Sequence, residues 1–91
     1  MKKVWNAIND ETRRKILSLL RKNDMTAGQI VECFQTSQPT ISHHLSVLKG
    51  AGLILSVKSA QSIIYSINKT VFQDFIMSIY ELFRIGIKSE T

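Results

Sequence analysis

The stretch Ser37–Ile54, SQPTISHHLSVLKGAGLI, decides which fold this sequence predicts. Ser37 is a good N-cap for a helix, and Pro39 suits the first helical turn, where its missing N–H costs nothing. Gly52 suits the left-handed position just beyond the end of such a helix. The apolar residues within it follow helical spacing and form one buried stripe: Ile41, Leu45 and Leu48.

Three shorter helices are predicted upstream of this stretch. A short amphipathic helix covers residues 4–9. Asp10 is the expected N-cap of a second helix that ends at about Lys22. Thr26 is the expected N-cap of a third, short helix. The apolar side of that third helix consists of Ala27, Ile30, Val31 and Phe34.

Downstream, the pattern changes to that of a β-hairpin and then returns to a helix. Leu53–Lys58 and Ser62–Ile67 are rich in β-branched and apolar residues, and Ser59–Gln61 joins them. A last helix runs from about Thr70 to about Ile85 with a broad apolar face. The predicted fold class is mainly α with a small β-hairpin, in the order α-α-α-α-β-β-α, and we expect residues 1–91 to form a single domain.

The composition suits a small basic protein with a polyanionic partner. The 91 residues carry a net charge of +5, and 44% of them are hydrophobic, which is generous for so short a chain. We therefore expect some apolar surface to be buried against a second copy. The single cysteine cannot form an internal disulfide, and no apolar run approaches the ~20 residues of a membrane span. With no apolar signal core after Met1–Lys3, the expected location is the cytoplasm.

Two short helices, a tight turn and a hairpin are typical of a DNA-binding unit. When the apolar stripe of the fourth helix faces inward, its hydrogen-bonding side chains face outward, and no acid lies between Gln38 and Lys49. Such side chains bond to base edges and phosphates in the major groove. The outward-facing residues are Gln38, Thr40, Ser42, His43 and Lys49. An ordinary solvated face of a three-helix core is the alternative interpretation.

The same helix does not carry catalytic chemistry. His43 and His44 are adjacent on a helix and point about 100° apart, so they cannot chelate one ion. Ser42 beside His43 has no acid to orient the ring, so it is no catalytic triad. We therefore predict that the protein is not an enzyme and has no small-molecule substrate.

Three collinear segments resemble the ArsR/SmtB family of bacterial repressors. Ser37–Ile54 resembles the family's recognition helix, Asp10–Leu17 the start of its second helix, and Ile64–Ile67 its second wing strand. The resemblance implies a winged helix-turn-helix fold and a homodimeric autorepressor that binds an inverted-repeat operator near its own promoter. The tip Lys58–Gln61 lacks the family's Gly and Arg, which makes a tight turn with positive φ and an arginine contact to the minor groove less expected.

The resemblance also assigns roles to particular residues. Base reading falls by position on Gln38, Thr40, Ser42 and His43, with Pro39 and Gln61 beside them in the DNA-binding set. Apart from the resemblance, we select as candidates for contacts to the DNA backbone the basic residues Arg13, Arg14, Lys49 and Lys58. The first and last helices are expected to form the dimer interface through Val4, Trp5, Ile8, Phe72, Phe75, Ile76, Ile79 and Phe83.

Many members of the family sense metals, but this sequence lacks their usual ligands. Thr26, Gly28 and Val31 occupy the third-helix positions that usually hold thiols, and the predicted last helix contains no His. Zinc and soft-metal sites need about three or four thiolate, imidazole or carboxylate ligands. We therefore expect no metal site and no cofactor, and a release from DNA that is controlled otherwise.

Several functions stay open at this level. Met25–Gly28 and Ser42–Leu45 resemble a metal-free subgroup, the SdpR-type autorepressors, which implies a membrane-bound immunity protein as a sequestering partner. Cys33 is either a redox sensor or, as the simpler interpretation, a small buried core residue. The alternatives to an operator-binding repressor are a redox-sensing repressor, a winged-helix protein-interaction module and a basic membrane-surface protein. The last is disfavoured because the basic residues are scattered.

Overall fold

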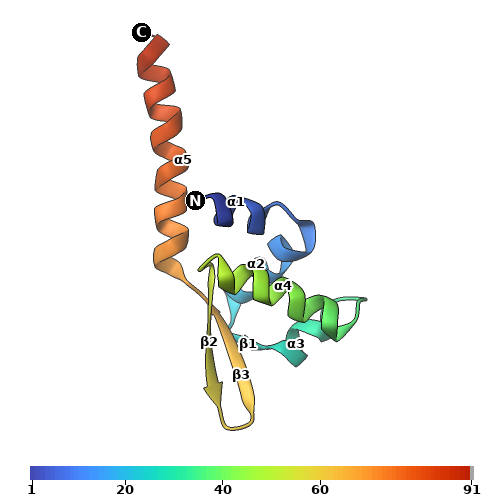
Figure 1. Cartoon of the computed structure of the whole chain (residues 1–91). Helices are drawn as coiled ribbons and strands as arrows, with labels where there is room; N and C mark the ends of the chain where they lie inside the picture. The colour runs from blue at the N-terminus through green and yellow to red at the C-terminus, as the bar shows by residue number, and fades with distance from the viewer. Residues whose placement is uncertain (91) are drawn as a thin grey trace.

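The computed structural model describes residues 1–90, with side chains through Arg84 (Figure 1). Within that range the elements are α1 (Lys2–Ile8), α2 (Glu11–Lys22), β1 (Met25–Thr26), α3 (Ala27–Glu32), α4 (Gln38–Gly50), β2 (Ile54–Ser59), β3 (Ser62–Ile67) and α5 (Lys69–Glu90). The predicted order of helices and hairpin is confirmed, with one added strand.

Side-chain caps begin three of the helices, as the sequence predicts. Asp10 accepts a hydrogen bond from the backbone N–H of Arg13 at the start of α2. Thr26 and Gln29 form a reciprocal capping box at α3. The Ser37 hydroxyl accepts from the Thr40 N–H at α4, where a proline lies in the first turn. These bonds satisfy amide groups that have no partner inside the helix.

The end of α4 turns the chain sharply into the wing, which we define as Ile54–Ile67. The Leu53 N–H donates to the Leu48 carbonyl at 3.0 Å, and the Gly52 N–H donates to the Lys49 carbonyl at 2.9 Å. This pair of bonds is a Schellman motif, and it requires a left-handed residue. Gly52 supplies that conformation with a φ of 79°, as predicted.

The hydrophobic core joins the helices to the base of the sheet. Its members are Val4, Ala7, Ile16, Leu17, Leu20, Ile30, Ile41, Leu45, Leu48, Leu53, Ile54 and Phe75. Burying one large aliphatic side chain contributes about 1.5–3 kcal/mol, so the three predicted stripe residues of α4 alone hold that helix firmly. All three are at most 2% exposed, which confirms the inward face of α4.

The sheet has a third strand that the sequence analysis missed. Its order is β1-β3-β2, and both pairings are antiparallel. Met25 pairs with Tyr65 and Thr26 pairs with Ile64. Two residues are too few to show the alternation that reveals a strand, and Thr26 also serves as the cap of α3. The short strand β1 thereby ties the start of α3 to the wing.

Several predicted boundaries differ from the structure. The first helix begins at Lys2 and ends at Ile8, and α3 ends at Glu32, so Phe34 packs on the core from a turn. The last helix begins at Lys69 because Asn68 caps it, accepting from the Val71 N–H. It continues to Glu90, five residues past the predicted end.

The tip of the wing is a tight two-residue turn. Ser59 and Ser62 are paired, which leaves Ala60 and Gln61 between the strands. Ala60 has a φ of 55°, in the left-handed region that favours glycine. The tip therefore adopts the positive φ that its composition made less expected, and an alanine carries the strain.

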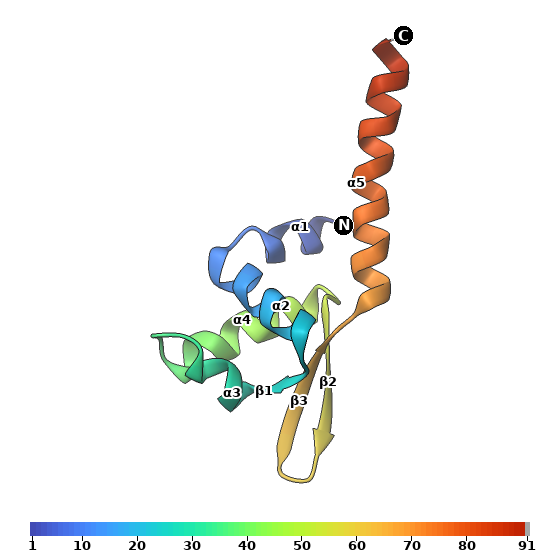
Figure 2. The same cartoon turned by 180° about the vertical axis from the view of Figure 1, so that it is seen from behind.

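The helix α5 projects from the rest of the molecule, as both views show (Figure 1, Figure 2). Of its described side chains only Phe75 is buried, and its ring packs edge-on against Trp5 of α1, with centroids 5.0 Å apart. Several large apolar side chains that follow Phe75 along the helix are exposed to solvent: Ile76, Met77, Tyr80, Leu82 and Phe83. Most of the described apolar surface of α5 is therefore not covered by other parts of the same chain.

The strained turn gives a first prediction. Ala60→Gly relieves the left-handed alanine, so the free energy of unfolding should rise by about 0.4–1 kcal/mol. Urea denaturation at one fixed protein concentration measures this change. The matched control is Ala51→Gly, where φ is −82° and glycine offers no relief. Equal effects of the two glycines would contradict the strain at Ala60.

Candidate DNA interface

The polar side chains of α4 form one exposed face, which we call the recognition face: Gln38, Thr40, Ser42, His43 and Lys49. All five are exposed, while the opposite stripe of the helix is buried. No acidic residue lies within α4. Pro39 is also exposed, in the first turn. The face therefore offers donors and acceptors without repelling a phosphate backbone.

The start of α4 is locally ordered. The hydroxyls of Ser37 and Thr40 lie 2.9 Å apart and share a hydrogen bond, and Ser37 also accepts from the Thr40 amide. A hydroxyl has one donor and two acceptor sites, so Thr40 keeps capacity for a further partner. The amino-terminal end of this helix carries partial positive charge, which favours phosphate oxygens.

The wing contributes little positive charge. Lys58 lies near the end of β2 and Gln61 in the turn, and both are exposed. Lys58 is the only charged residue in Ile54–Ile67. Val57 and Ile63, by contrast, are large apolar residues that are 63% and 47% exposed. The two wing residues predicted to meet DNA are therefore accessible, but the wing surface around them is mainly apolar.

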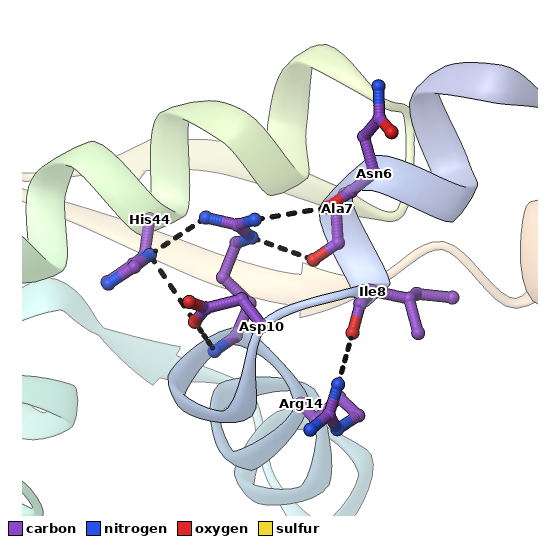
Figure 3. A network of polar contacts seen from close by, with 7 residues as sticks. Asn6, Ala7, Ile8, Asp10, Arg14 and His44 are labelled. Carbon is purple, nitrogen blue, oxygen red and sulfur yellow. Dashed lines mark hydrogen bonds and ion pairs between the residues drawn. The ribbon is translucent and has the colours of Figure 1, made fainter.

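Arg13 lies in a network of hydrogen bonds that joins α1, α2 and α4, and Figure 3 labels its partners Asn6, Ala7 and His44. Its Nε donates to the Ala7 carbonyl at 2.7 Å and its Nη2 to the Asn6 carbonyl at 3.1 Å. Its Nη1 lies 3.1 Å from Nδ1 of His44. Since a guanidinium only donates, Nδ1 of His44 accepts, and the ring proton is on Nε2 when the imidazole is neutral.

These arginines complete the C-terminus of α1. Its last four carbonyls have no partner inside the helix. The Trp5 carbonyl accepts from the Asn9 N–H, and the Ile8 carbonyl accepts from the Asp10 N–H and from Nη1 of Arg14. Arg13 donates to the remaining two carbonyls, those of Asn6 and Ala7, so each of the four has a donor. A helix of seven residues is held at its end by two side chains from α2.

Asp10 adds an acid to this junction. The hydrogen bond from the Arg13 N–H holds the pKa of Asp10 below its usual value, and burial opposes that effect. The positive charge of Arg13 lowers it further. The Asp10 carboxylate lies 3.8 Å from Nδ1 of His44, whose side chain is only 14% exposed. The two histidines thus face different surroundings, with His43 in solvent and His44 turned inward.

The sequence analysis missed this network and assigned Arg13 and Arg14 to the DNA backbone. The structure places Arg13 behind the recognition face, with three hydrogen bonds inside the protein. Arg14 is exposed and makes one bond, to Ile8. The sequence predicted the Asp10 cap and the end of the first helix just before it, but helical periodicity does not reveal that the Asn6 and Ala7 carbonyls face the Arg13 side chain. A DNA contact by either arginine stays a prediction.

The residues predicted for the dimer interface fall into three groups. Val4 and Phe75 are buried within the protomer. Ile8, Phe72 and Ile79 are half-buried. Trp5, Ile76 and Phe83 are exposed, at 50%, 58% and 69%. Further exposed apolar side chains are Met77, Tyr80 and Leu82 on α5 and Met1 just before α1.

Cys33 does not belong to the core. It is exposed at the end of α3, and its thiol donates to the Gln29 carbonyl at 3.5 Å. The interpretation as a buried core residue was therefore wrong: Cys33 directly follows the last residue of α3, and its side chain is exposed. Among the described residues no three His, Cys, Asp or Glu side chains are grouped to hold a metal ion. In that same range, no helix is both long and apolar enough to cross a membrane.

The wing, the paired short helices and the exposed polar face of α4 together define a winged helix-turn-helix transcriptional regulator, a DNA-binding protein and not an enzyme. The family model described as the bacterial regulatory protein, arsR family, matches residues 10–56. The chain belongs to this ArsR family.

Individual relatives agree with that assignment. The transcriptional repressor SdpR of Bacillus subtilis (strain 168) is 55% identical over 76 residues, which cover 84% of each chain. The arsenical resistance operon repressor of Staphylococcus aureus is 32% identical over 76 residues, covering 84% of this chain and 73% of that protein. The solved structure of an ArsR-like transcriptional regulator from Rhodococcus sp. RHA1 matches with a TM-score of 0.82 at 30% identity, covering 98% of this chain and 79% of that one. The winged helix-turn-helix prediction is thus confirmed.

The network at the end of α1 gives a stability prediction. Arg13→Gln leaves two helix-terminal carbonyls and a half-buried imidazole nitrogen without their donor. The free energy of unfolding should fall by about 2–3 kcal/mol, since three bonds are lost and each contributes about 1 kcal/mol net. Arg14→Gln removes a single exposed bond and should cost less than about 1 kcal/mol. Chemical denaturation of both variants checks this order, and equal losses would contradict it.

Asp10 gives a pH prediction. Its pKa is lower in the folded than in the unfolded chain, so the carboxylate stabilises the fold above the unfolded pKa. That contribution is lost as the pH falls through the folded pKa. The stability difference between wild type and Asp10→Asn should therefore shrink as the pH falls below about pH 4. Asparagine also caps helices, so the variant should fold. A difference that grows in acid would contradict the assignment.

Proposed function

We propose that this protein is a homodimeric transcriptional repressor that binds an inverted-repeat operator at its own promoter. The observation that carries the proposal is the exposed, acid-free recognition face of α4, held by a buried stripe on the other side of the same helix. Two of the relatives described above carry the name of repressors. The proposal extends that role to this chain as one domain acting in the cytoplasm.

Base reading is assigned to the first half of the recognition face. Gln38 bonds bidentately to an adenine edge, and the Ser42 and Thr40 hydroxyls bond to bases or phosphates. His43 supplies a further donor or acceptor from a ring that lies in solvent. Pro39 and Gln61 lie beside these contacts on the helix and the wing tip.

Phosphate contacts are assigned to cations outside the first turn. Lys49 at the end of α4 and Lys58 on the wing are exposed, and neither has an ion-pair partner among the described residues. Arg14 is the stronger of the two α2 candidates, because it is exposed and makes only one hydrogen bond, to the Ile8 carbonyl of α1. Arg13, which the sequence analysis proposed for the DNA backbone, is proposed instead to act mainly by holding α1 and α4 together.

Dimerisation is assigned to α1 and α5. The two helices border a groove of about 510 Å³ whose walls include Trp5, Ile79 and Leu82. Fully burying one large apolar side chain contributes about 1.5–3 kcal/mol. Six such side chains lie exposed on the described parts of these two helices: Trp5, Ile76, Met77, Tyr80, Leu82 and Phe83. Exposed apolar surface of this kind often marks a protein–protein interaction site. A second copy of the same pair of helices is the partner that we propose.

Release from the operator is proposed to be independent of metal. Thr26, Gly28 and Val31, at the third-helix positions that usually hold thiols, do not have side chains that bind metal. The name of the arsenical resistance operon repressor describes that relative, and we do not extend its arsenical response to this chain. By its resemblance to the metal-free subgroup, the protein is proposed to be sequestered by a membrane-bound immunity protein. A redox-sensing repressor is the second candidate, favoured by the exposure of Cys33. Against this candidate, the chain has no second cysteine with which Cys33 could form an internal disulfide.

The recognition face is tested by alanine substitution. Gln38→Ala and His43→Ala should each weaken specific operator binding by about 1–3 kcal/mol and leave the fold intact, since both side chains are exposed. Lys15→Ala on α2 is the control, because it removes an exposed side chain paired with Glu11 away from α4. Electrophoretic mobility shifts at fixed salt measure the affinities. Wild-type operator affinity in both variants would remove the base-contact assignment.

The dimer is tested on exposed residues. Phe75 is unsuitable because it is buried against Trp5 in its own protomer. Ile76→Glu and Phe83→Glu place a charge where the monomer is already solvated, so they should prevent dimerisation without unfolding the protomer. Thr70→Glu, an exposed position at the start of the same helix, is the control. Analytical ultracentrifugation should find monomers for the first two and a dimer for the control. Dimeric behaviour of all three would put the interface elsewhere.

A further inference from the structure

A cavity of about 460 Å³ lies between α2, the end of β3 and the start of α5. Its size falls within the range of about 300–1,000 Å³ that is usual for small-molecule sites. None of its lining residues belongs to α3 or α4. It is therefore separate from the recognition face.

The floor of this cavity is apolar. Leu17 of α2 is 8% exposed, and Ile67 at the end of β3 and Phe72 of α5 are half-buried. Ile8, the last residue of α1, closes one side. An apolar body placed on these side chains would be removed from water on the side that touches them.

The rim of the cavity is cationic. Arg14, Arg21 and Lys69 line it, together with the neutral Ser18 and Gln73, and no acid does. All three cations are exposed, and the ion pairs among the described residues do not include them. A shallower groove that shares Arg21 and Lys69 contains one acid, Asp24, and one more cation, Lys22. The local charge is positive on both sides of Arg21.

We propose that this cavity binds an amphipathic organic anion, namely an alkyl or aryl carboxylate. Its apolar body lies on Leu17, Ile67 and Phe72, and its carboxylate is bound by Arg21 and Lys69. Charge complementarity favours this occupant over α5 of a second copy. The described part of α5 carries Asp74 and Glu81 against Lys69 and Arg84, so it brings no net negative charge to three cations.

The site lies where the wing joins the dimerisation helix. Ile67 ends β3 and Lys69 begins α5, so an occupant contacts both elements within three residues. A bound anion that shifts α5 would alter the spacing of the two recognition faces in a dimer and so change operator affinity. This second step rests on the proposed function, whereas the binding step does not.

Calorimetric titration of the purified full-length protein tests the binding step. Octanoate is the probe, octanamide is the uncharged molecule of equal chain length, and acetate is the carboxylate without an apolar body. We expect octanoate to bind at least about tenfold more tightly than either, because a charge-assisted hydrogen bond to the head and an apolar contact to the chain are both needed. Octanamide binding as tightly as octanoate, or no octanoate binding at all, would overturn the proposal.

Variants locate the site. Arg21→Gln combined with Lys69→Gln should weaken octanoate binding about tenfold or more, and circular dichroism checks that the variant folds. Lys15→Gln removes a cation from the same helix α2 outside the cavity and should leave octanoate affinity unchanged. Equal effects of the two variants would mean non-specific binding and overturn the site.

The regulatory step is measured separately. Octanoate at saturating concentration should change operator affinity of the wild type by about threefold or more, within the usual range of coupling between sites, and should have no effect on the double variant. Unchanged affinity would overturn the coupling. If the wild-type protein did not bind the operator in the absence of octanoate, that result would instead contradict the proposed function.

Discussion

The burial of Ile41, Leu45 and Leu48 on one side of α4 is the constraint on which the rest of the molecule depends. A helix that commits three side chains to the core fixes the direction of every other side chain that it carries. Gln38, Ser42 and His43 are exposed as a consequence. The Schellman turn at Gly52 then sends the chain straight from this helix into the wing. The core and the proposed DNA-binding surface are thus two sides of one helix.

A second dependence runs through Arg13. This side chain donates hydrogen bonds to two carbonyls at the end of α1 and to His44 on the inner side of α4. The helix α1 is proposed to bind a second protomer, and α4 is proposed to bind DNA, so one guanidinium connects the two surfaces. Its contacts are hydrogen bonds with fixed directions, and they restrict how α1 can rotate relative to α4. The position of α5 is less constrained, because its packing on α1 consists largely of Phe75 against Trp5.

Much of the fold followed from local sequence, and most of what did not follow depends on tertiary contacts. The caps Asp10, Thr26 and Ser37 and the left-handed Gly52 were predicted because each acts on residues within a few positions of itself. The strand β1 was missed because its two residues acquire their partner only when β3 is in place. Arg13 was read as a surface cation because the carbonyls that it binds lie at the end of another helix. Burial of Cys33 was expected because a free cysteine without a second thiol is commonly a small core residue, and this expectation was wrong. The recognition face was predicted from helical spacing, and its contacts with DNA remain a prediction.

The most direct test of the account is footprinting of the metal-free protein on the DNA upstream of its own coding sequence, with a chelator present and across a salt series. The account predicts a protected inverted repeat, with affinity that falls steeply as salt rises because phosphate contacts release counterions. The protection should be the same before and after the chelator is added. Weak binding without a preferred sequence would contradict the assignment of the recognition face and favour a winged-helix module that binds another protein.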